Sequence, residues 1–215
     1  MAAAREASVG RILEFLAKEY PDARVLLEFR SSFELLVATV LSAQCTDERV
    51  NRVTPGLFRA FPEPRDFAEA SQSEVEEAVR STGFYRNKAK AIRELSAAIV
   101  RDHEGAVPAT MEGLVALPGV GRKTASVVLG ACCGVPALPV DTHVSRVAFR
   151  MGLTTEKTPD RIEKELAGKI PREQWWEFST RLGWHGRKVC AARKPKCGSC
   201  GLMPVCSRRG ITGSG

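Results

Sequence analysis

The chain has 215 residues, of which 44% are hydrophobic and 27% are charged, and its net charge at pH 7 is +7. This composition is that of a globular protein rather than a disordered one, and the length allows one domain or two small ones. The longest apolar runs, such as residues 35–41, are far too short to span a membrane, which argues against an integral membrane protein. The basic charge favours an anionic partner without identifying it.

Helical periodicity dominates the chain. Residues 9–16 form one apolar face, and residues 33–43, which Ser31 can cap, are apolar nearly all round, as expected of a central core helix. No stretch alternates as a half-buried strand does, so the predicted fold class is all-α. Pro136 and Pro139 mark a boundary between two lobes. Further helices are expected at 47–61, 71–81, 86–103, 110–117, 123–132, 141–151, 159–167 and 171–184, with breaks at Pro62 and Pro64.

Four cysteines near the C-terminus have the spacing C-x6-C-x2-C-x5-C, within a stretch (181–210) that has no acidic residue. Disulfides are disfavoured, because the seven cysteines are an odd number and residues 1–10 lack the apolar segment of a secretory signal. Structural zinc and a [4Fe–4S] cluster both suit four thiolates, and the spacing does not choose between them. The nearby basic residues predict phosphate contacts. The four cysteines are Cys190, Cys197, Cys200 and Cys206, and the basic residues are Arg193, Lys194 and Lys196.

The segment LPGVGRKTA (117–125) has two glycines between a short helix and a closely packed one. Glycines there permit a tight turn and leave backbone amides uncovered at a helix N-terminus, where an anion is favoured. The pattern fits either a phosphate grip or a plain helical corner. Lys123 opposes the helix dipole at this position, which makes it a candidate nucleophile. The alternative is an ordinary solvated lysine.

Three further segments carry candidate site residues. In VDTH (140–143), Asp141 can cap a helix or handle a proton near Lys123, and His143 is either a hydrogen-bonding residue or a catalytic one. Gln44 follows an apolar helix abruptly, where it can contact a base edge or end the helix. Phe84 precedes interleaved basic residues, a pattern that suits base stacking and phosphate contact as well as a packed turn. Those basic residues are Arg86 and Lys88.

Taken together and in order, these segments resemble the endonuclease III family of DNA glycosylases, over nearly the whole chain from about residue 31 to residue 206. The resemblance implies a two-lobed helix–hairpin–helix glycosylase fold, with a six-helix barrel lobe at 25–137 and an iron–sulfur cluster lobe at 1–24 and 138–215. It also implies that the four cysteines hold a [4Fe–4S] cluster.

The activity implied is base-excision repair of double-stranded DNA that contains oxidised or ring-saturated pyrimidines or abasic sites. The damaged base is flipped out, Lys123 attacks C1′ with the help of Asp141, and β-elimination cuts the strand 3′ to the abasic site. The implied DNA contacts are Gln44, Phe84, Arg86, Lys88, Gly119, Gly121, Arg122, Thr124, His143, Arg193, Lys194 and Lys196.

Two other functions remain open. An adenine-mismatch glycosylase of the MutY type is disfavoured, because that branch generally lacks a lysine at the position of Lys123 and carries an extra C-terminal domain. A helix–hairpin–helix DNA-binding protein without catalysis would need neither Lys123 nor Asp141. The expected protein is a bacterial or archaeal cytoplasmic monomer that works on nucleoid DNA and has no membrane partner.

Overall fold

The computed structural model of the chain describes residues 2–211, with side chains from Ser8 onward. Every regular element in that range is helical and no strand is present there, which confirms the all-α prediction. No helix in the described range has the length and apolar character needed to span a bilayer. The chain divides into two compact units, Val25–Val135 and a second unit made of Met1–Arg24 with Pro136–Gly215.

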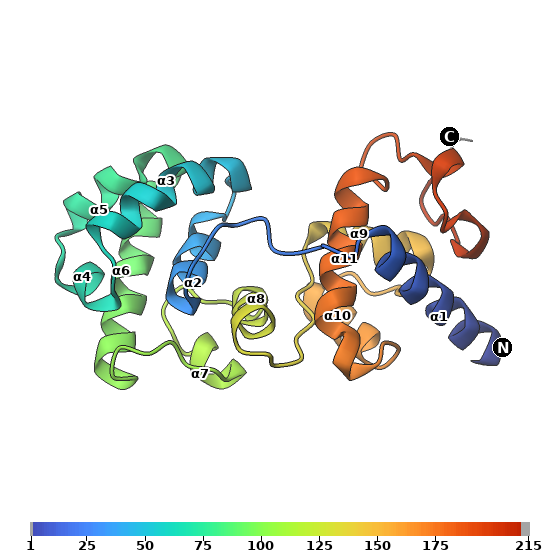
Figure 1. Cartoon of the computed structure of the whole chain (residues 1–215), viewed down its shortest axis with the longest axis horizontal. Helices are drawn as coiled ribbons and strands as arrows, with labels where there is room; N and C mark the ends of the chain where they lie inside the picture. The colour runs from blue at the N-terminus through green and yellow to red at the C-terminus, as the bar shows by residue number, and fades with distance from the viewer. Residues whose placement is uncertain (1, 212–215) are drawn as a thin grey trace. The chain divides into compact units, whose positions relative to one another are not determined.

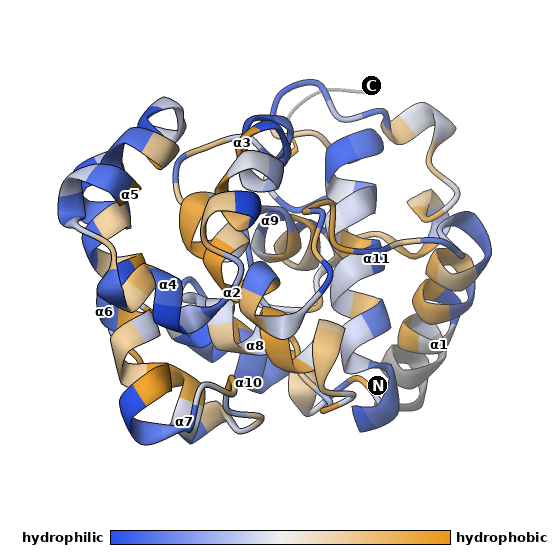
Figure 2. Cartoon of the chain, turned by 60° about the vertical axis from the view of Figure 1, so that its left-hand side comes forward, coloured by the Kyte–Doolittle hydropathy of each residue, from blue (hydrophilic) through white to orange (hydrophobic). Residues whose placement is uncertain are grey.

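The unit Val25–Val135 is built around α2, which Ser31 caps by accepting a hydrogen bond from the Glu34 amide. Residues 35–38 of α2 are fully buried, as its all-round apolar sequence predicts, and its ribbon is coloured as hydrophobic along most of its length (Figure 2). Each buried Leu or Val side chain among them contributes about 1.5–3 kcal/mol to stability. The helices of this unit are α2 (Ser32–Leu41), α3 (Asp47–Ala60), α4 (Pro64–Glu69), α5 (Gln72–Val79), the 3₁₀ turn η1 (Arg80–Thr82), α6 (Tyr85–Asp102), α7 (Met111–Val115) and α8 (Arg122–Cys132) (Figure 1).

Helix α4 is absent from the sequence prediction, which treated Pro62 and Pro64 only as breakers. Pro64 is instead the first residue of α4, where its fixed φ suits a helix and no amide is needed. The amide of Glu63 donates to the Asp66 carboxylate at 2.8 Å and closes the start of the helix. Phe67 then reaches the core, where its ring packs edge-on against Phe33.

The second unit joins the two ends of the chain. Its core includes Ile12 and Leu16 of α1, Val147 of α9, and Phe178 and Leu182 of α11. Helix α11 continues four residues beyond the predicted end at 184. The helices of this unit are α1 (Ala2–Glu19), α9 (Thr142–Met151), α10 (Pro159–Ala167), the turn η2 (Arg172–Gln174), α11 (Trp175–Lys188), and the turns η3 (Cys197–Ser199) and η4 (Met203–Val205) (Figure 1).

Candidate active site and cysteine pocket

The fold requires glycine at only one of the two glycine positions before α8. Gly119 has a φ of +74°, and a Cβ there would lie 3.0 Å from the Cβ of Ala91, so the fold itself requires glycine. Gly121 is the N-cap of α8 with a φ of −88°, and a Cβ there would meet nothing within 4 Å. Nothing inside the protein therefore explains glycine at 121. Its absence of a side chain leaves the first amides of α8 open to an anion from outside.

Lys123 is the second residue of α8 and is exposed to solvent. The first turn of the helix has no acidic residue, so the positive helix end is not neutralised from within the turn. On the opposite face, Ala125 and Val128 are fully buried and anchor the helix. Neighbouring Arg122 is exposed and Thr124 is half-buried. The turn thus presents an exposed amine beside uncovered backbone amides, an arrangement that suits work on a phosphate-bearing substrate.

Asp141 is the N-cap of α9, and its Oδ1 accepts a hydrogen bond from the Val144 amide at 2.7 Å. The capping role predicted for this residue is therefore confirmed. Its Oδ2 lies 4.0 Å from the guanidinium of Arg187, at the distance of a long ion pair. Asp141 belongs to one unit and Lys123 to the other, so their pairing stays a prediction.

His143 is the second residue of the same helix and is half-buried. Its Nδ1 lies 3.2 Å from the guanidinium of Arg146, and burial lowers the pKa of the imidazole. Both features favour the neutral ring at pH 7. The hydrogen-bonding role predicted as one alternative for His143 is therefore confirmed, while its contact with DNA stays a prediction.

Two turns of the Val25–Val135 unit present exposed side chains from strained backbone. Gln44 has a φ of +51° and Phe84 a φ of +48°, in the left-handed region that non-glycine residues seldom adopt. Phe84 is the N-cap of α6 and its side chain is 64% exposed, unusual for a large apolar residue. Arg86 stacks on the ring of Tyr85, with its guanidinium carbon 5.4 Å from the centroid. Both predicted DNA-contacting turns are thus accessible.

Lys88 requires a correction. Its side chain is only 5% exposed, and its ammonium donates a hydrogen bond to the Thr82 carbonyl at 2.8 Å. Sequence reasoning assigned Lys88 to a phosphate contact because it stands among exposed basic residues. The α6 periodicity turns it inward instead, on the same side as the buried Ala89 and Ile92. A buried ammonium that is bonded to the backbone is not placed to bind a phosphate directly.

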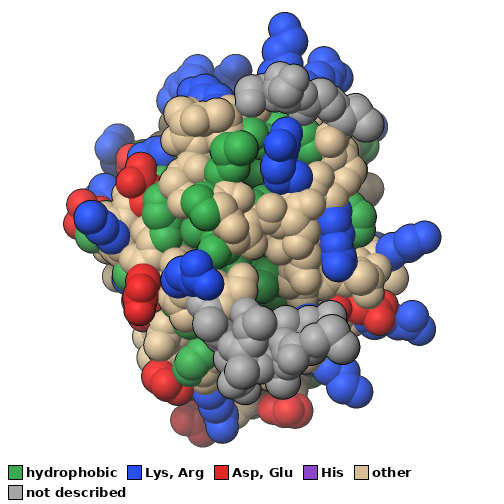
Figure 3. Space-filling view, turned by 90° about the vertical axis from the view of Figure 1, so that its right-hand side faces the viewer, with side chains coloured by type: hydrophobic (Ala, Val, Ile, Leu, Met, Phe, Trp, Pro, Cys, Tyr) green, Lys and Arg blue, Asp and Glu red, His purple; other side chains and the backbone are tan. Residues whose placement is uncertain are grey.

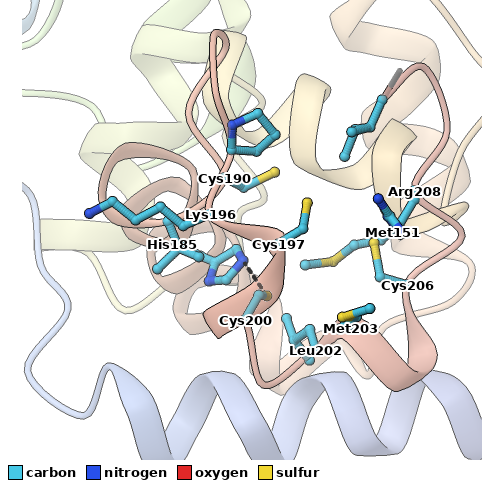
Figure 4. Close-up of a pocket in the computed structure, with 13 residues that line it drawn as sticks. Met151, His185, Cys190, Lys196, Cys197, Cys200, Leu202, Met203, Cys206 and Arg208 are labelled. Atoms are coloured by element: carbon cyan, nitrogen blue, oxygen red, sulfur yellow. Dashed lines mark hydrogen bonds between the residues drawn. The ribbon is translucent and has the colours of Figure 1, made fainter. Parts of the chain in front are cut away.

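The four predicted metal ligands line one pocket of the second unit, together with His185 and mostly apolar residues (Figure 4). In this view the sulfur atoms of Cys190, Cys197 and Cys206 face a common space, while the Lys196 side chain points away. Burial raises the pKa of the Cys200 and Cys206 thiols. Within the described residues, no three His, Cys, Asp or Glu side chains are arranged as the ligands of a single metal ion.

Two arginines of α9 hold the start of the cysteine loop, and sequence reasoning missed them. Arg150 is buried, and its guanidinium donates to the carbonyls of residues 190–192 and to the sulfur of Cys190 at 3.3 Å. Arg146 donates to the carbonyls of Gly186 and Cys190. The sequence does contain a pattern that indicates this pair, because arginines at positions i and i+4 of a helix lie on the same face.

His185 is a second missed residue of the pocket. It is 1% exposed, its Nδ1 lies 2.9 Å from the Tyr20 hydroxyl, and its Nε2 lies 3.6 Å from the Cys200 sulfur. Burial lowers the pKa of His185 to about 4 and raises the pKa of Tyr20 to about 12. Both groups are therefore neutral near pH 7. If Cys200 is a thiolate, it can only accept, so Nε2 carries the single ring proton and Tyr20 donates to Nδ1.

The basic residues predicted beside the cysteines lie on the surface. Arg193, Lys194 and Lys196 are all exposed, and the amide of Lys196 is tied to the Val189 carbonyl at 3.0 Å. On the face of the molecule shown in Figure 3, Lys and Arg side chains project around much of the outline. This unit therefore offers exposed cations on a loop whose backbone is held by hydrogen bonds from Arg150 and from the Lys196 amide.

Comparison with known proteins gives a consistent result. Residues 37–172 match the HhH-GPD superfamily of base excision DNA repair proteins. The chain is 49% identical to endonuclease III of Synechocystis sp. over 205 residues, covering 95% of this chain and 94% of that protein. It is 45% identical to endonuclease III of Bacillus subtilis over 195 residues, covering 90% and 89%.

A solved structure of a trapped endonuclease III–DNA covalent intermediate superimposes with a TM-score of 0.90 at 43% identity, covering 94% of this chain and 96% of that one. The all-helical fold agrees with these matches. The protein belongs to the endonuclease III family within the HhH-GPD superfamily, as the resemblance in its sequence motifs predicted.

Proposed function

We propose that this protein is a DNA glycosylase and abasic-site lyase that removes oxidised or ring-saturated pyrimidines from double-stranded DNA. The observation that carries the proposal is the exposed Lys123 amine at the start of α8, beside backbone amides that Gly121 leaves uncovered. A solved relative with a TM-score of 0.90 was trapped as a covalent intermediate with DNA, which requires a nucleophile of this kind.

The turn before α8 would bind a phosphate of the damaged strand. Amides at a helix N-terminus and the helix dipole both favour an anion, and Gly121 allows the backbone to approach it closely. Arg122 and Thr124 flank this position. Gln44 and Phe84 would enter the base stack while the damaged base is flipped into a pocket. Arg86 and the exposed basic loop at 193–196 would neutralise further phosphates.

The proposed chemistry begins when the neutral Lys123 Nζ forms a bond to C1′ of the deoxyribose and the bond from C1′ to the base breaks. The base leaves with the bonding electrons and takes up a proton. The C1′–O4′ bond then opens to give an imine between Lys123 and the sugar. A base, either water or a carboxylate, then takes a proton from C2′, and the imine accepts the electrons that this leaves. A double bond forms between C2′ and C3′ as the C3′–O bond breaks, and the 3′ phosphate leaves by β-elimination. Water finally hydrolyses the imine and frees the lysine.

Asp141 would accept a proton and stabilise the positive charge that develops during these steps. Its Oδ1 accepts a hydrogen bond from the Val144 amide, and its Oδ2 lies 4.0 Å from the guanidinium of Arg187. A carboxylate so placed would take the Lys123 proton before attack and stabilise positive charge at the sugar as the base leaves.

The experiment that tests the function is base release and strand cleavage on a duplex with one oxidised pyrimidine. Wild-type enzyme should produce both, and release of neither product would contradict the proposal.

We also propose that the cysteine pocket holds a [4Fe–4S] cluster. Four thiols line one pocket in mostly apolar surroundings, where thiolates need a compensating positive charge. Four cysteine thiolates are the usual ligands of a [4Fe–4S] cluster, and the resemblance to the endonuclease III family implies one at these residues. When bound, the cluster supplies sulfur–iron bonds that stiffen the basic loop. Arg150 and His185 would each donate a hydrogen bond to a ligating sulfur.

Replacing Cys206 with serine is expected to remove the cluster, because serine lacks the soft thiolate ligand. Wild-type protein should be yellow-brown and hold about four irons per chain, whereas the Cys206→Ser variant should lose most of its visible absorption. Cys132→Ser is the matched control, since Cys132 is an exposed cysteine of the other unit. Iron analysis and visible spectra of anaerobic preparations decide the question. Colourless wild-type protein containing zinc would rule out the cluster.

The two glycines of the turn are expected to respond differently to alanine. Gly119→Ala should destabilise the fold by about 1–2 kcal/mol, because of its left-handed φ and the nearby Ala91. Gly121→Ala should stay folded but bind abasic-site DNA about tenfold more weakly, the loss of roughly one charge-assisted hydrogen bond. Thermal unfolding and fluorescence anisotropy with an abasic-analogue duplex measure the two effects. Undiminished DNA affinity in Gly121→Ala would contradict the phosphate grip.

A further inference from the structure

Phe84 begins α6 from a backbone conformation that is unusual for a helix start. Its φ of +48° and ψ of +28° lie in the left-handed region, whereas every other α-helix of the Val25–Val135 unit follows a residue with extended backbone. The left-handed region is unfavourable for a residue with a Cβ and persists only where the surroundings impose it. Phe84 is 64% exposed, so packing of its own ring does not impose it.

Lys88 holds the backbone on both sides of Gly83. Its ammonium donates to the Thr82 carbonyl at 2.8 Å, and its amide donates to the Phe84 carbonyl at 3.1 Å. Thr82 is itself buried, and its hydroxyl donates to the Val79 carbonyl at 2.8 Å. The chain that leads into Phe84 is therefore tied to the interior of the unit by two buried side chains.

A buried lysine is costly, so its presence needs a reason. Lysine is among the residues least often found inside proteins, and an apolar side chain would fill the same space without the desolvation penalty. Lys88 is only 5% exposed. Among the residues that the structure describes, its ammonium has one hydrogen-bond acceptor, the Thr82 carbonyl. What the ammonium adds beyond packing is therefore its hold on the turn before Phe84.

The first turn of α6 is also held, from the side of α5. The Gln72 side chain donates to the Arg86 carbonyl at 3.1 Å and to the Glu76 carboxylate at 2.8 Å. This bond keeps the backbone after Phe84 in place, while Lys88 holds the backbone before it. The exposed ring of Phe84 thus stands on a turn that is fixed from both directions.

We infer that Lys88 is a positioning residue, which acts with Thr82 to hold Phe84 in the left-handed conformation before DNA binds. The inference rests on the proposed function, in which Phe84 enters the base stack. A ring that is already in place loses little conformational freedom when it inserts. Without the ammonium, the turn can relax towards the extended backbone of the other helix starts, and the ring leaves its position. Lys88 itself does not touch the nucleic acid.

The test compares Lys88→Met with Lys90→Met. Methionine keeps a long apolar stem in place of the lysine and removes the ammonium. Lys90 is an exposed lysine of the same helix, 3.8 Å from Glu94, and controls for the loss of one positive charge. The duplex carries one oxidised pyrimidine next to 2-aminopurine, whose fluorescence rises on unstacking. Stopped-flow fluorescence, single-turnover base release and the salt dependence of the dissociation constant are measured.

We expect Lys88→Met to lower the rates of the fluorescence rise and of base release by about tenfold, the effect of one lost hydrogen bond from a charged group. Lys90→Met should match wild type in both rates. The slope of log affinity against log salt should be the same in Lys88→Met as in wild type. A slope flatter by about one unit would mean a lost phosphate contact and would overturn the inference. Rates equal to those of wild type would overturn it as well.

A second background separates positioning of Phe84 from a general loss of structure. In a chain that already carries Phe84→Ala, Lys88→Met should have little further effect on the fluorescence rise, because the ring that it positions is absent. Stability lost at Lys88 would instead appear in both backgrounds. If Lys88→Met slows the rise by the same factor with and without the ring, Lys88 acts elsewhere and the inference fails.

Thr82→Val decides the question if Lys88→Met does not fold. Valine has nearly the same size and removes only the hydroxyl that bonds to the Val79 carbonyl. It should slow the fluorescence rise by about threefold in the wild-type chain, the effect of one lost neutral hydrogen bond, and should add little to Phe84→Ala. An unchanged rate in the wild-type chain would overturn the inference. Wild-type protein that releases no base would contradict the proposed function itself, which these comparisons among variants do not.

Discussion

Replacing Lys123 with glutamine is expected to abolish the covalent complex that borohydride traps with damaged DNA. Strand cleavage should slow by about a thousandfold or more, because an amide cannot attack C1′ or form an imine. The fold should be retained. Lys123 is exposed at the positive end of α8, where a cation opposes the helix dipole, so a neutral side chain of similar length should not lower the free energy of unfolding.

Lys90→Gln is the control for this experiment, since it makes the same chemical change at an exposed lysine of the same unit. Its covalent complex should form at the wild-type rate. A complex that survives in Lys123→Gln would place the nucleophile elsewhere. Wild-type protein that releases the base without any complex would instead use water, as a monofunctional glycosylase does. Wild-type protein that forms no complex and releases no base, even from several lesions, would be a DNA-binding protein without catalysis.

Replacing Asp141 with asparagine should separate its two roles. Asparagine caps helices as well as aspartate does, so the hydrogen bond to the Val144 amide and the fold should survive. The negative charge and the proton acceptor are lost. We expect the single-turnover rate of complex formation to fall by about a hundredfold to ten-thousandfold, the usual contribution of a positioned general base. Rapid-quench kinetics with borohydride measure this rate.

Two further variants separate the loss of a helix cap from the loss of the carboxylate. Asp141→Ala should lose the cap as well and cost an additional ~1 kcal/mol of stability. Ser31→Ala removes the corresponding cap of α2 and should cost similar stability with unchanged chemistry per folded molecule. Full activity in Asp141→Asn would show that Asp141 is only a cap.

The fold was predictable where the pattern of apolar residues is strong. The all-round apolar run of α2 and the two-sided pattern of α6 both fix a helix without further information, and both predictions are confirmed. The end of α11 was not predictable, because Gly183 and Gly186 weaken the pattern there. Position 186 needs glycine because a Cβ there would lie 3.0 Å from the Cβ of His143 in α9. Only the packing of two helices reveals that requirement.

In the candidate site, too, features made by residues adjacent in sequence could be predicted, whereas contacts between residues far apart in sequence could not. Gly119, Gly121 and Lys123 lie within five residues, so one short segment displays the turn and its amine together. The partners of Arg150 are some 40 residues away in sequence, and Tyr20 lies 165 residues from His185. Nothing in a single sequence relates positions that far apart. The inward orientation of Lys88 likewise depends on what α6 packs against.

The second unit is discontinuous, and this affects the order in which the chain can fold. During synthesis the whole Val25–Val135 segment emerges before any residue of α9 or α11 exists. Ile12 and Leu16 of α1 therefore have no core to pack against until α9 and α11, in the last third of the chain, have been made. The second unit then forms when its two segments meet, for example where the Trp184 indole donates a hydrogen bond to the Arg24 carbonyl. The Val25–Val135 segment that connects them is already folded by then, so bringing the two segments together costs little further chain entropy.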